Sequence, residues 1–431
     1  MFPERRQRML EAMGPDAVAF LLGARLATRS NDTQYPFRQD SDFWYLTGFD
    51  HPHAVAVLRT DGGPEFTLFV EPREREKEIW EGHRPGVEGA RRDFGADEAH
   101  PIADFHAQIP RLLEGVKRVF HVLGQLPAVD ARIAETLSEM RLRSRQGLIP
   151  PAEIIDPRAP LHEMRLFKQS DEVEHLRRAA EITREAHAAA ARLAQDGTYE
   201  YELEATLNYV FRRRGARGPA YTTIVGGGAN ATVLHYISND RPLRGGDLVL
   251  IDAGCEVEGY AADVTRTYPV GGKFSGPGRA VYEVVLAAQR AALDLARPGA
   301  TLEQLHEAAL RKLVEGMLSL GLLSGSVDDL VAGDDYRRYY MHRTSHWLGL
   351  DVHDVGAYVV DGKPRPLAAG ICFTVEPGLY IAPDDERAPE SLRGIGVRIE
   401  DDVLITPDGH ENLSAALPKH PDDVEAWVNA S

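Results

Sequence analysis

Short apolar runs and longer helical periods follow one another along the chain, which predicts a mixed α/β protein. Residues 53–58 and 66–70 are apolar runs typical of strands, and residues 61–64, Asp-Gly-Gly-Pro, are typical of the turn between them. The apolar run over residues 17–22 is too short for a secretion signal, so we expect a buried first strand there. Residues 101–146 are mainly helical in pattern.

A concentration of prolines separates two parts of the chain. Four prolines fall between positions 150 and 160, and proline removes backbone donors and ends helices. The length of 431 residues also favours more than one hydrophobic core. We therefore predict one domain over residues 1–165 and a second domain over residues 166–431.

The second part shows signs of an internal duplication. Two helical patterns precede a group of strands and the same order then repeats: helices over 170–197 and 200–214, strands over 247–270, helices over 279–296 and 301–321, and strands over 371–405. The repeat is visible residue by residue, because the segment from Gly246 through Asp252 to Gly254 aligns with Gly370 through Glu376 to Gly378. Two halves facing each other across a pseudo-twofold would each deliver carboxylates to a shared centre.

The composition excludes several classes of protein. The net charge is −17, so we expect neither nucleic acid nor a membrane as a partner, since both attract clustered Lys and Arg. No run reaches the ~18 apolar residues that a membrane helix needs. Only two cysteines are present, Cys255 and Cys372, which favours reduced thiols and a cytoplasmic location.

Carboxylates follow the predicted strands of the first half. Asp252 ends an apolar run, and a carboxylate there is costly to bury unless it is paired or bound to a metal. By itself, Asp252 is better explained as the cap of a turn with Gly254. Asp263 follows eleven residues later, and if residues 254–259 form a turn, both carboxylates point to one face. Two carboxylates on one face repel each other unless a cation lies between them.

The second half offers the matching groups. Glu376 and Glu400 occupy positions equivalent to those of Asp252 and Asp263, and His346 lies in a segment with three histidines in twelve residues. Four carboxylates and one imidazole are too many ligands for one ion and suit a two-metal site. Oxygen ligands with one nitrogen favour Mn(II), Co(II) or Zn(II).

Five segments carry long and specific motifs: Tyr35–Gly48, His162–Lys168, Leu250–Cys255, His346–His353 and Thr374–Gly378. They resemble the N-terminal domain signature, the domain junction and the metal-site segments of the aminopeptidase P branch of the pita-bread metallopeptidase family. The resemblance spans nearly the whole chain. It implies an α/β fold in which a creatinase-like, mixed α/β N-terminal domain precedes a pita-bread catalytic domain with a pseudo-twofold duplication.

The resemblance also implies a ligand set and a reaction. Asp263 and Glu400 would bridge two divalent ions, with Mn(II) as the expected metal and Co(II) or Zn(II) as alternatives. Asp252 would hold one ion, and His346 with Glu376 the other. A metal-bridging hydroxide would attack the scissile carbonyl, and Glu376 would pass the proton of the water to the leaving nitrogen.

Further residues acquire roles from the same resemblance. His353 would stabilise the developing negative charge of the carbonyl oxygen, and His235 would line the pocket for proline. The residues implied to bind substrate are His342, Arg398, Tyr380, Asp32 and Trp80. For Arg398, a structural ion pair is an equally good interpretation. For Trp80, a packing role without a contact to substrate is equally good.

The predicted activity is the release of the N-terminal residue from peptides whose second residue is proline. The alternative is a prolidase, which cleaves Xaa-Pro dipeptides with the same ligands. Creatinase shares the fold but works without metals, and pita-bread binding modules lack the complete ligand set, so the intact ligands disfavour both. The resemblance also implies a homo-oligomer, either a dimer or a tetramer.

Overall fold

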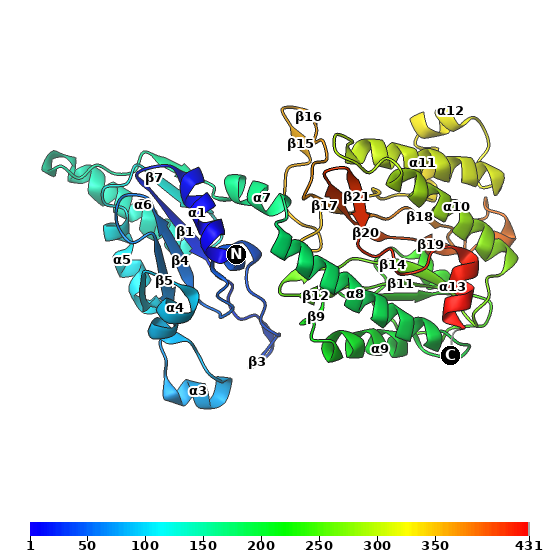
Figure 1. The fold of residues 1–431 in the computed structure, drawn as a ribbon, viewed down its shortest axis with the longest axis horizontal. Coiled ribbons are helices and arrows are strands. Elements are labelled where there is room, and N and C mark those ends of the chain that lie inside the picture. Colours follow the sequence, from blue (N-terminus) through cyan, green and yellow to red (C-terminus); the bar gives the residue numbers. More distant parts are fainter. Residues whose placement is uncertain (430–431) are drawn as a thin grey trace. The chain divides into compact units, whose positions relative to one another are not determined.

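The computed structural model describes residues 1–429 and divides the chain into two compact units, Met1–Met164 and Arg165–Ser431. Both units combine helices with strands (Figure 1). Within the described residues, no helix has both the length and the apolar character that crossing a bilayer requires.

A six-stranded mixed sheet forms the centre of the N-terminal unit. The strand order is β6-β5-β4-β1-β7-β8, and β1 is antiparallel to β4 but parallel to β7. The strands are β1 (Ala17–Leu22), β4 (Val55–Arg59), β5 (Phe66–Val70), β6 (Glu98–Pro101), β7 (Arg118–His121) and β8 (Glu153–Ile155). Every residue of β1 is buried, which confirms the predicted first strand.

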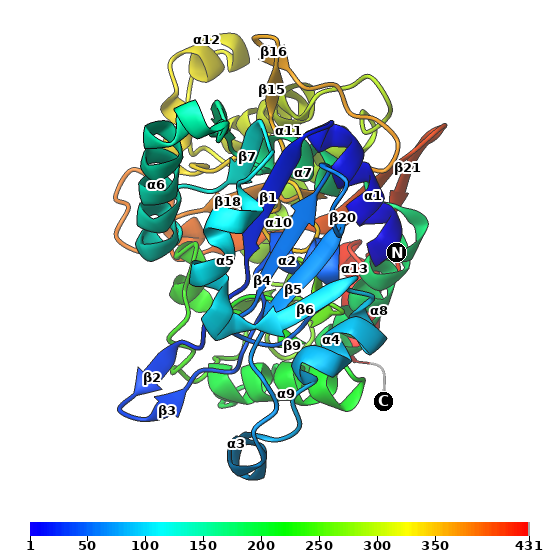
Figure 2. The same ribbon diagram turned by 90° about the vertical axis from the view of Figure 1, so that its left-hand side faces the viewer.

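Helices cover this sheet on both sides. Apolar side chains of β1, β4 and β7 pack against α5 (Phe105–Leu112) and α6 (Pro127–Leu142) in one core cluster (Figure 2). Helix α1 (Phe2–Met13) lies on the other side of the sheet (Figure 1). The remaining elements are β2 (Thr28–Ser30), β3 (Thr33–Gln34), α2 (Ser41–Thr47), α3 (Arg75–Glu81), α4 (Gly86–Phe94) and α7 (Arg158–Leu166), the last of which runs across the unit boundary.

The prediction that residues 101–146 are mainly helical is confirmed, although the short strand β7 follows α5 in the chain and joins the sheet before α6 begins. The proline-rich stretch is not only a linker, since β8 pairs in parallel with β7 within it. Four- and three-residue strands are too short to show a period of their own. Their identity depends on the neighbouring strands.

The C-terminal unit confirms the predicted helix pairs. The helices of the two halves are α8 (Ser170–Leu193), α9 (Glu200–Arg213), α10 (Gly276–Leu293) and α11 (Leu302–Ser319). At the start of α11, the Thr301 hydroxyl accepts from the Gln304 amide and the Gln304 side chain accepts from the Thr301 amide, which is a capping box. Two shorter helices complete the unit, α12 (Val327–Ala332) and α13 (Pro421–Val428).

The strands of this unit lie between the pair α8 and α9 and the pair α10 and α11 (Figure 1). The main sheets are β10-β11-β14 and β17-β20-β21, in which β11 is antiparallel to β14 and β17 to β20. Their strands are β10 (Ile224–Gly227), β11 (Leu248–Asp252), β14 (Thr265–Pro269), β17 (Cys372–Val375), β20 (Asp401–Thr406) and β21 (Gly409–Asn412). The smaller strands are β9 (Gly218–Pro219), β12 (Cys255–Val257), β13 (Tyr260–Ala261), β15 (Val359–Val360), β16 (Lys363–Pro364), β18 (Gly378–Tyr380) and β19 (Gly396–Arg398).

The two halves join where their carboxylate-bearing strands meet. The amide of Glu400 donates to the carbonyl of Thr265 at 3.0 Å, and the hydroxyl of Thr267 donates to the carbonyl of Arg398 at 3.1 Å. This contact places the end of β19 beside β14. The duplicated order of elements thereby brings the acidic strand ends of both halves to one place.

The predicted turn over residues 254–259 is wrong in part, because residues 255–257 form β12, which pairs with β9 and β13. The chain instead crosses itself at Gly254, where any side chain would overlap the carbonyl oxygen of Ala262. The amide of Ala253 donates to the carbonyl of Val264 at 3.1 Å next to this crossing. Only glycine permits so close an approach. The crossing therefore brings residues 252–253, which precede β12, close to residues 263–264, which follow β13.

Candidate active site

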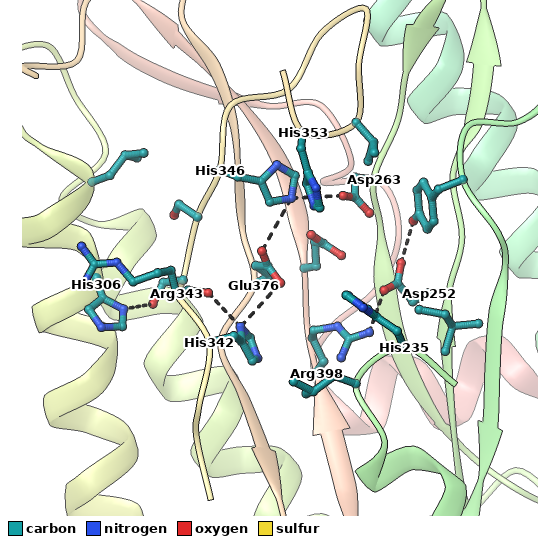
Figure 3. A pocket seen from close by; sticks show the side chains of 18 of the residues that line it. His235, Asp252, Asp263, His306, His342, Arg343, His346, His353, Glu376 and Arg398 are labelled. Atoms are coloured by element: carbon teal, nitrogen blue, oxygen red, sulfur yellow. Dashed lines mark hydrogen bonds and ion pairs between the residues drawn. The ribbon is translucent and has the colours of Figure 1, made fainter. Parts of the chain in front are cut away.

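A cavity of about 770 Å³ opens between the two halves of the C-terminal unit (Figure 3). Its volume falls in the range that small-molecule and peptide sites occupy. The titratable residues that line it are Tyr221, His235, Asp252, Asp263, His306, His342, Arg343, His346, His353, Tyr358, Glu376, Arg398 and Glu400. All five predicted metal ligands are therefore in the wall of one cavity.

Three of these ligands form a tight cluster. One ligand atom each from Asp263, His346 and Glu400 lies within 4.8 Å of the other two. Nε2 of His346 is 3.3 Å from Oδ2 of Asp263 and 3.6 Å from Oε1 of Glu376. Nδ1 of the same ring lies 3.0 Å from the carbonyl of Trp347, which favours a proton on Nδ1 and leaves Nε2 with its lone pair toward the carboxylates.

Backbone pairing positions His346 and Glu376 together. The segment that carries His346 runs along β17, where the amide of Thr374 donates to the carbonyl of His346 and the amide of Glu376 donates to the carbonyl of Thr344. The two side chains therefore come from neighbouring backbones, although they are thirty residues apart in the sequence.

The electrostatics of the cluster demand cations. Burial raises the pKa of Glu400 well above its ordinary value, and the nearby carboxylates raise it further. Burial also raises the pKa of Glu376 to about 7, against the opposing charges of His346 and Arg398. Although burial disfavours a charged imidazole, Asp263 and Glu376 raise the pKa of His346 to about 9. A site of hard oxygen donors with one imidazole and excess negative charge fits Mn(II), Co(II) or Zn(II).

Asp252 lies at the edge of this cluster and is held by two neighbours. Oδ2 of Asp252 accepts from Nη2 of Arg398 at 2.6 Å, and Oδ1 accepts from the hydroxyl of Tyr221 at 2.6 Å. The other donors of Arg398 bind the hydroxyl of Tyr380 at 2.9 Å and Oγ1 of Thr265 at 3.1 Å. The geometry favours the structural ion pair for Arg398, since its guanidinium already holds protein acceptors.

The predicted histidines surround the carboxylates. The ring of His353 meets that of His346 edge to face with centroids 4.4 Å apart. Nδ1 of His342 is 3.8 Å from Oε2 of Glu376, and its Nε2 is 2.9 Å from the hydroxyl of Tyr380. Burial lowers the pKa of His342 to about 4, so this ring is neutral near pH 7. His235 lies in the opposite wall, in front of Asp252 (Figure 3).

Other predicted residues are placed differently. Tyr380 is buried and reaches the site only through its bonds to His342 and Arg398. Asp32, in the exposed turn between β2 and β3, and Trp80, which is 89% exposed on α3, belong to the N-terminal unit. Their proposed contacts with substrate stay predictions.

The sequence interpretation missed four of the titratable residues that line the cavity, Tyr221, His306, Arg343 and Tyr358. Tyr221 precedes β10 and binds Asp252, whereas His306 and Arg343 form the far side of the cavity (Figure 3). Nδ1 of His306 lies 2.8 Å from Oγ1 of Thr344. The one available signal was the position of Arg343 next to His342, because neither Tyr221 nor His306 stands in a motif with ligand spacing.

Two family models match the chain. The family model described as metallopeptidase family M24 matches residues 174–407, and the model described as aminopeptidase P, N-terminal domain, matches residues 2–121. The chain is 47% identical over 432 residues to the Xaa-Pro aminopeptidase of Escherichia coli, with 100% of this chain and 98% of that protein covered.

Solved structures agree with these matches. The chain is similar to the aminopeptidase PepP of Pseudomonas aeruginosa, with a TM-score of 0.96 and 46% identity over 99% of this chain and 97% of that one. It is equally similar to a zinc-substituted E. coli aminopeptidase P in complex with product, with a TM-score of 0.95 and 47% identity over 99% and 97% of the two chains.

Proposed function

Because the chain belongs to metallopeptidase family M24 and carries the N-terminal domain of aminopeptidase P, we propose that it is an Xaa-Pro aminopeptidase. The reaction is the metal-dependent hydrolysis of the bond between a first residue and a proline that follows it. The observation that carries the proposal is the single cavity that collects four carboxylates and an imidazole from both halves of the duplicated fold. The family match confirms the predicted fold, with a pita-bread domain after a creatinase-like N-terminal domain.

The aminopeptidase is favoured over the other members of the fold. The relatives that match over the full length are named Xaa-Pro aminopeptidases, and the N-terminal match is to aminopeptidase P, which favours this activity over that of a prolidase. A metal-free creatinase or a binding module would not need the cluster of Asp263, His346 and Glu400.

As a metallopeptidase of this family, the protein uses divalent metal ions, and we propose two per chain, with Mn(II) as the expected metal. Asp252, Asp263, His346, Glu376 and Glu400 would hold the ions. Two cations in such a site lower the pKa of water enough to supply hydroxide near neutral pH.

The side chains around the ions have separate tasks. Oε1 of Glu376 lies 3.6 Å from Nε2 of His346 in the cavity wall, and the Glu376 carboxylate would accept a proton and return it to the leaving nitrogen. Burial lowers the pKa of His353, so its ring is neutral near pH 7 and can still donate one hydrogen bond to the carbonyl oxygen. Arg398 fixes the orientation of Asp252 through the 2.6 Å ion pair.

Selection of proline follows from the shape of the cavity wall. The bond before proline is a tertiary amide without an N–H group, and the ring fixes φ. A pocket that packs the ring therefore needs no acceptor for an amide hydrogen. The cavity wall offers apolar side chains and imidazole rings on both sides for this contact: Leu234, His235, Ile237, His342, Val352 and His353.

The decisive experiment removes the metals, restores them one at a time, and compares three substrates. We expect Ala-Pro-Ala to be cleaved with a higher kcat/KM than Ala-Pro, and Ala-Ala-Ala to be cleaved poorly. A preference for Ala-Pro would assign a prolidase. Equal rates on Ala-Pro-Ala and Ala-Ala-Ala would refute the proline pocket and indicate a broad aminopeptidase.

We also propose a cytoplasmic homo-oligomer, either a dimer or a tetramer, that acts on peptides and binds neither nucleic acid nor membranes. The net charge of −17 supports the absence of nucleic acid and anionic membranes as partners. Both cysteines are buried as free thiols, which supports a reducing compartment. Size-exclusion chromatography with light scattering measures the oligomer directly.

A further inference from the structure

Arg343 is a cationic side chain in the wall of the catalytic cavity that has no role in the reaction described above. It follows His342 in the segment that leads to His346. Figure 3 shows Arg343 and His306 across the cavity from Asp252 and His235, with Glu376 and His346 between the two groups. The cavity therefore extends past the carboxylate cluster toward the start of α11.

The guanidinium of Arg343 is available to a ligand, in contrast to that of Arg398. Arg398 is 4% exposed and uses its donors on Asp252, Tyr380 and Thr265. Among the described residues, the one partner of Arg343 is Glu303, at 3.4 Å, and the two side chains are 67% and 59% exposed. An ion pair this exposed and this long is weak, so another carboxylate can replace Glu303.

The surroundings of Arg343 suit an anion. Burial, with a smaller contribution from the charge of Arg343, lowers the pKa of His306 to about 4, so the neighbouring ring is neutral and adds no second cation. The acidic residues that line the cavity are Asp252, Asp263, Glu376 and Glu400, and all four belong to the proposed metal site. Glu303 is not one of the lining residues. Among the described residues, the carboxylate that a negative group would have to displace from Arg343 is therefore the exposed Glu303.

The chemistry of an exopeptidase decides which part of the peptide lies there. The free ammonium of the substrate is one residue away from the scissile bond, so it must lie near the carboxylate cluster. A guanidinium would repel that ammonium. The cavity arm that holds Arg343 therefore takes the other side of the peptide, beyond the proline.

We propose that Arg343 is a specificity residue that binds a carboxylate of the peptide downstream of proline and exchanges Glu303 for it. The carboxylate is either the C-terminus of a short peptide or the side chain of an acidic residue. This inference rests on the proposed Xaa-Pro aminopeptidase activity. It adds a charge preference that the proline pocket does not provide.

The test compares substrates that differ only in this charge. Ala-Pro-Ala is measured against Ala-Pro-Ala-amide for the C-terminal source, and Ala-Pro-Asp-amide against Ala-Pro-Asn-amide for the side-chain source. In the wild-type protein, we expect a lower KM for the acid of one or both pairs. Arg343→Gln should raise that KM about two- to fivefold, the range for an exposed ion pair, and should leave the KM of the neutral partner unchanged.

Two further variants make the result specific. Glu303→Gln removes the competing carboxylate and should lower the KM of the acidic substrate. Arg337→Gln is the control for Arg343→Gln. Arg337 is 63% exposed and pairs with Asp334, and it does not line the cavity. The control should leave the acid-to-amide ratio of KM values unchanged. Because exposed charges are screened, raising the salt concentration should also reduce the acid preference of the wild-type protein.

The outcomes separate this inference from the proposed function. Cleavage of Ala-Pro-Ala and its amide with equal KM, together with no acid preference in the Asp and Asn pair, overturns the role of Arg343 but retains the aminopeptidase. An acid preference that survives in Arg343→Gln also overturns it. Failure of the metal-loaded wild-type protein to cleave any of the four peptides overturns both.

Discussion

Replacing Asp354 by Asn should destabilise the C-terminal unit and displace the neighbouring His353. The carboxylate of Asp354 is 1% exposed and bridges two buried cations, with Oδ2 2.8 Å from Nζ of Lys168 and Oδ1 2.6 Å from Nη2 of Arg165. Its backbone amide donates to the carbonyl of Trp347 at 2.9 Å. The bridge therefore fixes the loop that carries His353 against the segment that carries His346.

The expected magnitude follows from burial. Removal of one partner from a buried ion pair leaves an uncompensated charge and lowers the free energy of unfolding by about 3–5 kcal/mol. Burial alone would raise the pKa of Asp354, but Lys168 and Arg165 outweigh it and hold the pKa below its usual range. Because the folded-state pKa is depressed, the stabilisation is complete above about pH 4, the pKa of an unfolded Asp, and is lost as the pH falls through the folded-state pKa.

The assay is urea unfolding of the wild-type and Asp354→Asn proteins at pH 7, with kcat/KM for Ala-Pro-Ala measured under native conditions. A shift in His353 of about 1 Å lowers kcat/KM by up to about 10²-fold. Metal content should stay unchanged, because Asp354 is not a proposed ligand.

Asp351→Asn is the matched control, since this carboxylate also contacts Arg165, at 2.7 Å, but is 37% exposed. It should lower the free energy of unfolding by about 1 kcal/mol or less. Equal losses in the two variants, or a loss below 1 kcal/mol for Asp354→Asn, would refute the reasoning from burial.

Three further predictions concern the proposed metal site and its neighbours. Asp263→Ala should lose both ions, because a bridging ligand serves both, and elemental analysis that finds at most one ion in fully active wild-type enzyme would contradict the two-metal site. Glu376→Gln should retain appreciable metal but lose turnover by roughly 10²–10⁴-fold, since the amide cannot accept a proton. Near wild-type kcat in that metal-loaded variant would assign the proton transfer to another group. His353→Ala and His235→Ala should lower kcat/KM at unchanged metal content, and metal loss in either would identify a misassigned ligand.

The local patterns of the sequence predicted the helices and the longer strands well. The 3.6-residue period identified α8, α9, α10 and α11, because each buries one apolar face against the strands. Strand β12 lies within the predicted strand stretch 247–270, but the four-residue strand β7 was not distinguished from the helices on either side of it. Strands of that length are defined by the strands beside them, so their identity depends on contacts that a local window does not contain.

The sequence by itself determined the duplicated helix and strand order, the family, and the residue types of the carboxylate and imidazole cluster. These follow from periodicity and from motifs that are contiguous in the chain. Only the tertiary structure decided that Arg398 binds Asp252 and that Arg343 lines the cavity. It also decided that Tyr380 contacts His342 without lining the cavity itself. The physical reason is that a side chain's direction and partners depend on which distant backbones pair. Asp252 and Arg398 are 146 positions apart, and no local spacing encodes their contact.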